Sequence, residues 1–231
     1  MRIPVLTSDL HFPEPLRGMD GLVAIGGDLS TKRLLAAYEQ GVFPWFNPED
    51  PICWWSPDPR CVFIPGEVKV SKSLRQRLRK TDYHVTTDRD FEAVIHHCAN
   101  AKDRQNATWI SSRMKKAYLL LFQSGYAHSF EVRNAEGQLV GGLYGVSIGA
   151  AFFGESMFSL QPDASKLALL AVDAFARQND FLLIDGQLEN DYLIQMGARM
   201  MPRPTFLEKL GLSKEKPTIG GHWDFTYRHA V

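Results

Sequence analysis

The chain has 231 residues, of which 45% are hydrophobic, and its 26 basic side chains balance its 26 acidic ones. This length is enough for one large domain or for a small and a medium one, and the composition is that of a soluble globular protein. No apolar run approaches the ~20 residues that cross a bilayer, and the first residues lack a signal pattern. Three unpaired cysteines indicate reduced thiols, so we expect a cytoplasmic protein without a membrane partner.

The first predicted helix covers residues 31–40 and ends at Gly41, because glycine is the usual residue after a helix. A Gly-Gly-Asp sequence at 26–28 precedes it. That sequence lacks the Lys-Ser/Thr pair of a phosphate-binding loop, so it indicates only a turn.

Residues 43–60 are the most unusual stretch, since they contain three of the five tryptophans and five of the thirteen prolines. Proline fixes φ and lacks an amide donor, so we predict an ordered loop and neither a helix nor a central strand. Its tryptophans Trp45, Trp54 and Trp55 fit either a core seal or an aromatic wall for a flat or apolar ligand. We expect a domain boundary just after this stretch.

Residues 69–80 concentrate positive charge, with six basic and no acidic side chains, and they leave the rest of the chain acidic. A helix here, capped by a serine, buries Leu74 and Leu78 on one face. The opposite face carries Lys72, Arg75 and Arg79. A solvated surface is the commoner meaning of a short charge run, but the absence of acidic residues favours a polyanion such as tRNA.

The second half of the chain alternates helical and strand patterns. Phe91, Val94, Ile95 and Cys98 mark one face of a helix. A further helix at 111–125 has one apolar face, made of Met114, Ala117, Tyr118, Leu121 and Phe122, and another at 165–177 is capped by Asp163. Strands are predicted at 127–133, 138–144, 147–153, which Gly154 ends, and 181–184. This order is typical of GNAT-type acyltransferases. The expected fold is therefore α+β, with a small N-terminal domain at 1–61 and a GNAT-like domain with a mixed sheet and flanking helices at 62–231.

Two kinds of cofactor are not expected. Acyl-CoA enzymes of that fold hold the pyrophosphate on a glycine-rich loop before the central helix, and the matching residues 156–165 contain no glycine. His96, His97 and Cys98 diverge around a helix, so they do not form a metal site. The sequence predicts neither CoA nor a metal.

Two short segments after strands indicate a reaction centre, because strand ends open onto the crevice of α/β folds. They are residues 154–159, which include Glu155, and the sequence Asp185-Gly186-Gln187. In an extended chain Asp185 and Gln187 point to the same side, where the carboxylate can polarise or position the amide. A turn or cap role for Asp185 remains the alternative.

Many motifs between about Leu22 and Met200 strongly resemble, in unbroken order, the bacterial leucyl/phenylalanyl-tRNA–protein transferases. These motifs are Gly27-Asp28, Phe43-Pro44-Trp45-Phe46, Trp54-Trp55-Ser56-Pro57-Asp58-Pro59-Arg60, Thr108-Trp109-Ile110, His128-Ser129, Gly141-Gly142-Leu143-Tyr144-Gly145, residues 154–159, Ala164-Ser165-Lys166 and Ile184-Asp185-Gly186-Gln187. The resemblance implies transfer of leucine or phenylalanine, with methionine as a third candidate, from leucyl-tRNA or phenylalanyl-tRNA. The acceptors are proteins with an N-terminal arginine or lysine, which the transfer marks for N-degron proteolysis.

The resemblance also implies roles for individual residues. The catalytic pair corresponds to Asp185 and Gln187, and the carboxylate that receives the basic acceptor residue to Glu155. The pocket for the donor side chain corresponds to Trp45, Trp109, Leu143 and Phe152, with Tyr38 and Ser159 nearby. Leu143 and Val172 depart from the methionine and phenylalanine expected there, and such apolar exchanges change the side-chain preference by ~1–3 kcal/mol.

Three rival functions remain at this point. A peptidoglycan-type aminoacyl transferase uses the same donor but a cell-wall acceptor, and the acidic Glu155 suits a cationic acceptor better. A GNAT acetyltransferase conflicts with the missing glycine loop. An RNA-binding module would explain the basic stretch and the tryptophans, but not the Asp-Gly-Gln segment.

Overall fold

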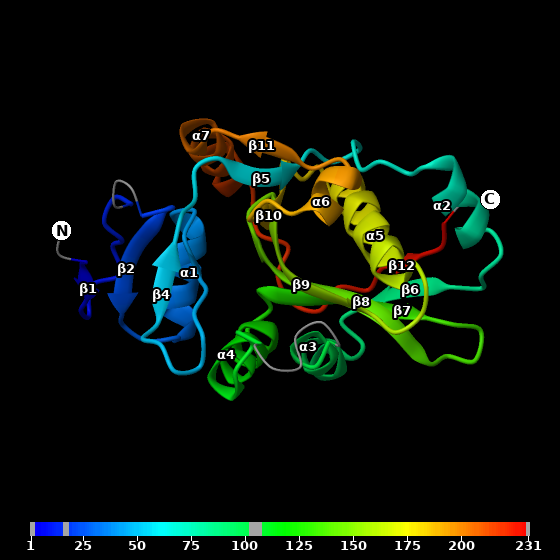
Figure 1. Ribbon diagram of the computed structural model, residues 1–231, viewed down its shortest axis with the longest axis horizontal. Helices are drawn as coiled ribbons and strands as arrows, with labels where there is room; N and C mark the ends of the chain where they lie inside the picture. The colour runs from blue at the N-terminus through cyan, green and yellow to red at the C-terminus, as the bar shows by residue number, and fades with distance from the viewer. Residues whose placement is uncertain (1–2, 16–18, 102–107, 230–231) are drawn as a thin grey trace.

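The computed structural model describes residues 3–15, 19–101 and 108–229, which form two β-sheets with helices around them (Figure 1). The smaller sheet belongs to the N-terminal part of the chain, and α1 packs beside it. Its strand order is β1-β2-β4-β3, with β1 parallel to β2. The elements of this part are β1 (Val5–Leu6), β2 (Leu22–Gly26), α1 (Thr31–Glu39), β3 (Phe43–Pro44) and β4 (Cys53–Trp55).

The prediction that residues 43–60 contain no central strand is wrong, because β4 lies between β2 and β3. The prolines lie outside β4, and Pro44 lies on the edge strand β3, where its missing amide is tolerated. Trp54 on β4 is fully buried and donates its indole N–H to Gly26 O at 2.9 Å. Trp54 is therefore a core residue, whereas Trp45 is 42% exposed.

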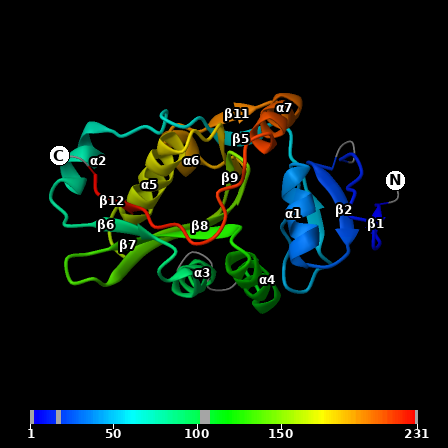
Figure 2. The same cartoon turned by 180° about the vertical axis from the view of Figure 1, so that it is seen from behind.

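The larger sheet has eight strands in the order β11-β5-β10-β9-β8-β7-β6-β12. It is mixed, because β9 and β10 are parallel and the other described pairs are antiparallel. Helices α3 and α4 cover one face, and α5 crosses the other (Figures 1 and 2). The strands are β5 (Arg60–Phe63), β6 (His84–Thr87), β7 (Ala127–Arg133), β8 (Leu139–Ile148), β9 (Ala151–Ser159), β10 (Leu183–Gln187), β11 (Arg199–Met201) and β12 (Thr226–Tyr227).

One predicted strand is misplaced. The predicted strand at 147–153 consists of the end of β8, a turn and the start of β9. Gly149 makes this turn, because its φ of +55° suits glycine and an added Cβ would lie 2.1 Å from Ser213 O. Gly154, expected to end a strand, lies inside β9.

The helices agree with their predicted faces. In α3 (Phe91–Ala99) and α4 (Ser112–Gln123) the core-facing residues are buried as expected, apart from half-buried Phe122. In α2 (Lys72–Leu78) Leu74 and Leu78 are buried, and Ser71 Oγ caps the helix by accepting Leu74 N–H. The remaining helices are α5 (Ala164–Gln178), α6 (Asp191–Gln195) and α7 (Arg203–Lys214).

The predicted cap of α5 is wrong in its mechanism. Asp163 occupies the N-cap position, but its side chain makes no capping bond and its backbone is left-handed, with φ of 61°. Its carboxylate instead contacts Arg77 of α2 and Lys166 of α5. These two cations therefore replace the capping amides as partners of Asp163.

The two sheets share a core. One buried cluster joins α1 to α3 and α4, and a second lies between α5 and the other face of the larger sheet. Strand β5 crosses the predicted boundary at 61/62, and the division at that point stays a prediction. Among the described residues, no helix is long and apolar enough to cross a membrane.

Candidate active site

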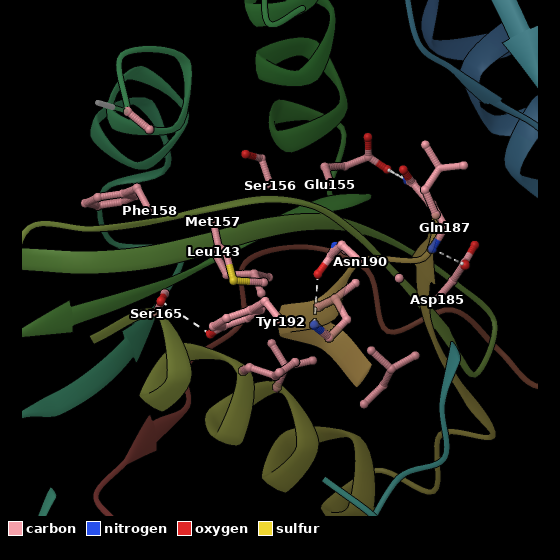
Figure 3. Close-up of a pocket in the computed structure, with 18 of the residues that line it drawn as sticks. Leu143, Glu155, Ser156, Met157, Phe158, Ser165, Asp185, Gln187, Asn190 and Tyr192 are labelled. Carbon is pink, nitrogen blue, oxygen red and sulfur yellow. Dashed lines mark hydrogen bonds between the residues drawn. The ribbon is translucent and has the colours of Figure 1, made fainter. Parts of the chain in front are cut away.

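A cavity of about 950 Å³ opens where the pairing between β9 and β10 stops. The parallel pairing covers only Leu183–Asp185 against Ala151–Phe153, while β9 continues to Ser159. Beyond that point residues of both strands line the cavity, together with residues of α5 and α6 (Figure 3). The prediction that both reaction-centre segments follow strands is wrong, because residues 154–159 lie within β9 and Asp185–Gln187 within β10. Residues of both segments nevertheless line the cavity.

The apolar wall of the cavity contains all the residues expected to hold a donor side chain. Leu143 on β8 and Phe152 on β9 are buried, and Trp109 and Trp45 complete the wall. Phe152 packs against Gly145, where an added Cβ would lie 2.5 Å from the ring. Trp45 is fixed at the rim, because Trp55 donates its indole N–H to Trp45 O at 2.7 Å.

Gln187 lines the cavity in a strained backbone conformation, with φ of 64° at an irregular point of β10. Such a conformation is costly for a residue other than glycine, so the surroundings must hold it. Gln187 N–H donates to Asp185 Oδ1 at 2.8 Å, and Gln187 Nε2 donates to Glu155 Oε1 at 2.7 Å. Asp185 thus positions the backbone of Gln187, while Glu155 orients its side chain.

Asp185 is fully buried and paired with Arg60, which is equally buried. Arg60 Nε lies 2.9 Å from Asp185 Oδ1, and Arg60 Nη2 lies 2.7 Å from Oδ2. The guanidinium also donates to Gly41 O at 3.1 Å and lies over the rings of Phe43 and Phe206 at 4.7 and 4.6 Å. This fork holds the carboxylate in one orientation.

Glu155 on β9 lies at the inner wall with 9% of its surface exposed. Tyr38 Oη lies 2.8 Å from its Oε1, and Tyr118 Oη lies 2.6 Å from its Oε2. The two hydroxyl oxygens are themselves 2.6 Å apart. Burial raises the pKa of Glu155 to about 7, although the bonds from the tyrosines oppose this shift.

The other two predicted site residues, Tyr38 and Ser159, support the site indirectly. Tyr38 reaches the site only through Glu155. Ser159 lines the cavity, but its hydroxyl donates to Gln161 O and accepts Ser165 N–H, so it shapes the entry to α5. The hydroxyl oxygens of Tyr192 and Ser165 lie 3.3 Å apart beside the cavity, and Asn190 Oδ1 accepts Leu193 N–H at the start of α6 (Figure 3).

The basic helix α2 lies outside the cavity. Lys72 and Arg75 on this helix are exposed, as is Arg79 directly after it. Arg77 is also exposed but pairs with Asp163. The structure therefore does not bring the expected tRNA-binding residues into the cavity, and any contact with tRNA would concern a separate surface.

Sequence reasoning missed two residues that hold this site, Arg60 and Tyr118. Arg60 was one letter in a motif and gave no sign of its partner 125 positions away. Tyr118 was read as one more apolar position of α4, although a buried tyrosine hydroxyl needs a hydrogen-bond partner. Among the described residues no three His, Cys, Asp or Glu side chains are grouped as metal ligands.

Comparisons with known proteins show the family of the chain. The family model described as "Leucyl/phenylalanyl-tRNA protein transferase" matches residues 62–211, and the model of the N-terminal domain of that family matches residues 27–58. A protein from Desulforapulum autotrophicum named "Leucyl/phenylalanyl-tRNA--protein transferase" is 49% identical over 96% of this chain and 97% of its own. A protein of the same name from Syntrophus aciditrophicus is 50% identical over 91% of this chain and 88% of its own.

Among solved structures, one described as "The structure of L-PGS from Bacillus licheniformis" aligns with a TM-score of 0.41 and 9% identity. The alignment covers 86% of this chain and 65% of that one. The family matches and the two relatives decide the assignment, because they extend over nearly the whole chain at about half identity. The chain belongs to the leucyl/phenylalanyl-tRNA protein transferase family and is an aminoacyltransferase.

Proposed function

We propose that this protein transfers leucine or phenylalanine, with methionine as a third candidate, from aminoacyl-tRNA to acceptor proteins that begin with arginine or lysine. The product is then marked for N-degron proteolysis. One observation carries this proposal: a single cavity joins an apolar wall to the polar group formed by Glu155, Asp185 and Gln187. The apolar wall suits the donor side chain, and the polar end suits an amine.

The donor side chain lies between Trp45, Trp109, Leu143 and Phe152 in this proposal. The cavity is open enough for a leucine or phenylalanine side chain together with part of the terminal nucleotide. Val172 of α5 also lines it. Leu143 and Val172 stand where methionine and phenylalanine are expected, so the shape of the pocket differs there. In this proposal these two residues set the relative preference for leucine, phenylalanine and methionine.

The chemistry needs no covalent enzyme intermediate, because aminoacyl-tRNA is already an activated ester. The enzyme holds the ester carbonyl next to the α-amine, and positioning supplies much of the rate. In this proposal the side-chain carbonyl of Gln187 orients the amine, while its NH₂ group is already bound to Glu155. Asp185 is the positioning residue that holds the strained Gln187 backbone.

Glu155 receives the basic first residue of the acceptor in this proposal. An ionised carboxylate offers about four lone-pair sites. Three are occupied, two on Oε1 by Tyr38 and Gln187 and one on Oε2 by Tyr118. One site on Oε2 therefore remains for a cationic group of the acceptor.

The larger sheet supports a GNAT-like fold for residues 62–231. Its parallel strands β9 and β10 pair over three residues, and the residues of both strands beyond that pairing line the cavity. The chain from Phe158 to Ser165 beside the cavity has no glycine, which disfavours a CoA pyrophosphate there. We extend the proposal to a small N-terminal domain at 1–61 and to a cytoplasmic location.

The exposed face of α2 binds the tRNA body in this proposal. Lys72 and Arg75 on α2 and Arg79 directly after it are exposed, whereas Arg77 pairs with Asp163. Such a face contacts phosphates without reading sequence.

The assay that tests the function measures labelled leucine transferred from charged tRNA to an Arg-starting peptide. Asp185→Ala and Gln187→Ala should each lower turnover by about 10²-fold or more, because each disturbs the amine position. The double variant should be little worse than either single one, since the two residues act as a unit. If the wild type is active and Asp185→Ala has near-normal turnover, the assignment of Asp185 to the site is wrong.

A second experiment separates tRNA binding from chemistry. Changing Lys72, Arg75 and Arg79 to Glu should weaken binding of every tRNA while sparing transfer from a minimal aminoacyl-adenosine donor. Each lost phosphate contact should reduce the log-log salt slope by about 0.7 to 0.9. The control is Lys209→Glu on α7, and equal loss in both variants would contradict a role specific to α2.

A further inference from the structure

The hydroxyls of Tyr38 and Tyr118 and the carboxyl group of Glu155 form a closed ring of hydrogen-bond contacts. The three oxygen–oxygen distances are 2.6 Å between the tyrosines, 2.8 Å from Tyr38 to Oε1 and 2.6 Å from Tyr118 to Oε2. Each contact needs one proton, and each hydroxyl supplies one. Two tyrosines thus supply two protons for three contacts, so the ring is complete only when Glu155 carries the third.

The proposed reaction requires a group that takes up a proton. A protein α-amine has a pKa of about 7.7–8.0, so near neutral pH it is mostly an ammonium without a lone pair for attack. Gln187 is a neutral amide and a poor base. Asp185 is fully buried, and its oxygens are occupied by Arg60 and by Gln187 N–H. Glu155 is the carboxylate that lines the cavity with only neutral partners.

We propose that Glu155 is the proton acceptor of the transfer reaction, taking its proton from the α-ammonium of the acceptor, with Tyr38 and Tyr118 as positioning residues that bind the proton-loaded form. The inference rests on the proposed function and specifies which cation of the acceptor Glu155 receives. Its basis is the ring, which in the ionised state lacks one proton.

The groups that face Glu155 favour uptake of that proton. Burial is the largest cause that raises its pKa to about 7, and the negative charge of Asp185 on β10 acts in the same direction. Tyr38 on α1 and Tyr118 on α4 remain neutral donors, because burial raises the pKa of each well above its usual value. Tyr144 on β8 packs edge-on against Tyr118, with ring centroids 5.5 Å apart. Arg60 faces Asp185 and not Glu155.

The steps balance in atoms and charge. The ammonium gives one proton to the Glu155 carboxylate, which becomes a carboxylic acid, and the nitrogen gains a free lone pair. The amine attacks the ester carbonyl, the N–C bond forms, and the C–O bond to the ribose breaks. The second proton of the nitrogen leaves with the ribose oxygen as its hydroxyl hydrogen. Glu155 finally releases its proton to solvent.

The first test measures stability against pH for the wild type and Glu155→Gln, whose amide supplies the third proton permanently. A pKa raised from 4.5 in the unfolded chain to about 7 stabilises the fold below pH ~4.5, and this contribution is lost as pH rises through 7. The unfolding equilibrium constant of the wild type should therefore rise by ~10²-fold relative to the variant over this range. A stability difference that does not change with pH overturns the inference but leaves the proposed transfer function standing.

The matched control is Glu131→Gln. Glu131 on β7 is a buried carboxyl outside the cavity, and burial raises its pKa also. It should show pH-dependent stability of its own, but the pH profile of transfer should not change. If the pH profile of transfer changes in Glu131→Gln, altered stability alone changes that profile. This result would overturn the inference that Glu155 is the proton acceptor.

The second test measures kcat/KM against pH with an aminoacyl-adenosine donor. The wild type should be bell-shaped, since it needs ionised Glu155 and the ammonium form of the acceptor. Glu155→Gln should be ~10²-fold or more slower near pH 7 and should rise to a plateau above the amine pKa. A descending limb that persists in Glu155→Gln, or that vanishes in His97→Gln instead, overturns the assignment, because His97 also lines the cavity.

The third test separates the α-ammonium from the side-chain cation. Arg-starting and norleucine-starting peptides have the same α-amine, so Glu155→Gln should lower kcat by the same factor for both. A penalty confined to the KM of the Arg peptide overturns the inference but leaves the proposed function intact. If Glu155→Gln does not fold, Tyr118→Phe replaces it, because this variant keeps the carboxyl group and breaks the ring. A low-pH side of the kcat/KM profile that does not shift in Tyr118→Phe also overturns the inference.

Discussion

Glu155 and Asp185 lie on neighbouring strands of one sheet and are both buried, yet their surroundings differ completely. Both carboxylate oxygens of Asp185 on β10 accept hydrogen bonds from the guanidinium of Arg60. Glu155 on β9 is bound by two tyrosine hydroxyls and an amide, and no cation pairs with it among the described residues. Burial alone therefore does not decide what a carboxyl group does.

Because their hydrogen-bond partners differ in charge, the two carboxyl groups have different roles. A carboxylate with a fixed cationic partner has no reason to exchange its proton, so Asp185 serves geometry by holding Gln187 N–H. A carboxyl group with neutral donors pays the full cost of burial, and its pKa rises to about 7. That value lies where a proton acceptor is most effective near neutral pH.

The largest effect is expected from Arg60→Met, which leaves the charge of Asp185 buried without a partner. The free energy of unfolding should fall by about 3–5 kcal/mol, as for other broken buried pairs. Urea denaturation near pH 7 measures it. As a control, Arg89→Met breaks the exposed pair with Asp224 and should cost at most about 1 kcal/mol. Equal losses in the two variants would contradict the contrast.

A double variant, Arg60→Met with Asp185→Leu, sharpens the same contrast. Replacing a buried ion pair by apolar side chains is often neutral for stability, so most of the loss should be recovered. Turnover should stay low, because Gln187 loses the oxygen that accepts its backbone N–H. Recovery of both properties together would show that Asp185 has no role beyond pairing with Arg60.

A smaller effect is expected from Tyr118→Phe on the Glu155 side. At a pH below 6 the ring holds its third proton, and losing this hydroxyl removes two of the three contacts. The free energy of unfolding should fall by about 1–3 kcal/mol. Tyr126→Phe, which lies between α4 and β7 and outside the ring, is the matched control. A Tyr118→Phe loss no larger than that of the control would mean that the ring contributes nothing.

Much of this fold was predictable from periodicity. The buried faces of α3 and α4 followed from apolar spacing, and β7 was predicted with its observed bounds. The turn at Gly149 was not, because the apolar run through 147–153 continues on both sides of it. Periodicity shows which residues are buried, but a turn inside a buried hairpin leaves no polar signal.

The site was predictable in its members and less so in their contacts. Trp45, Leu143, Phe152, Glu155 and Gln187 do line one cavity. The sequence does not distinguish buried Trp54 from Trp45, since both lie in one proline-rich aromatic stretch. Nor does it show the partners of Asp185 and Glu155, because Arg60, Tyr38 and Tyr118 come from distant positions that only the packed sheets bring together.

The smallest effect concerns a third carboxylate, Asp163, whose cationic partner Arg77 is half exposed. The hydrogen bond from Arg77, with help from Lys166, lowers the pKa of Asp163 to about 2. A lowered pKa stabilises the fold above the unfolded value of 3.8, and this contribution is lost as pH falls through 2. Asp163→Asn should therefore be less stable than the wild type only above pH ~4, by less than Tyr118→Phe, because solvent and salt screen an exposed pair. Denaturation across this pH range, at low and high salt, measures the difference. If Asp163→Asn lost as much free energy of unfolding as Arg60→Met, at low and at high salt alike, exposure of the cation would not weaken the pair.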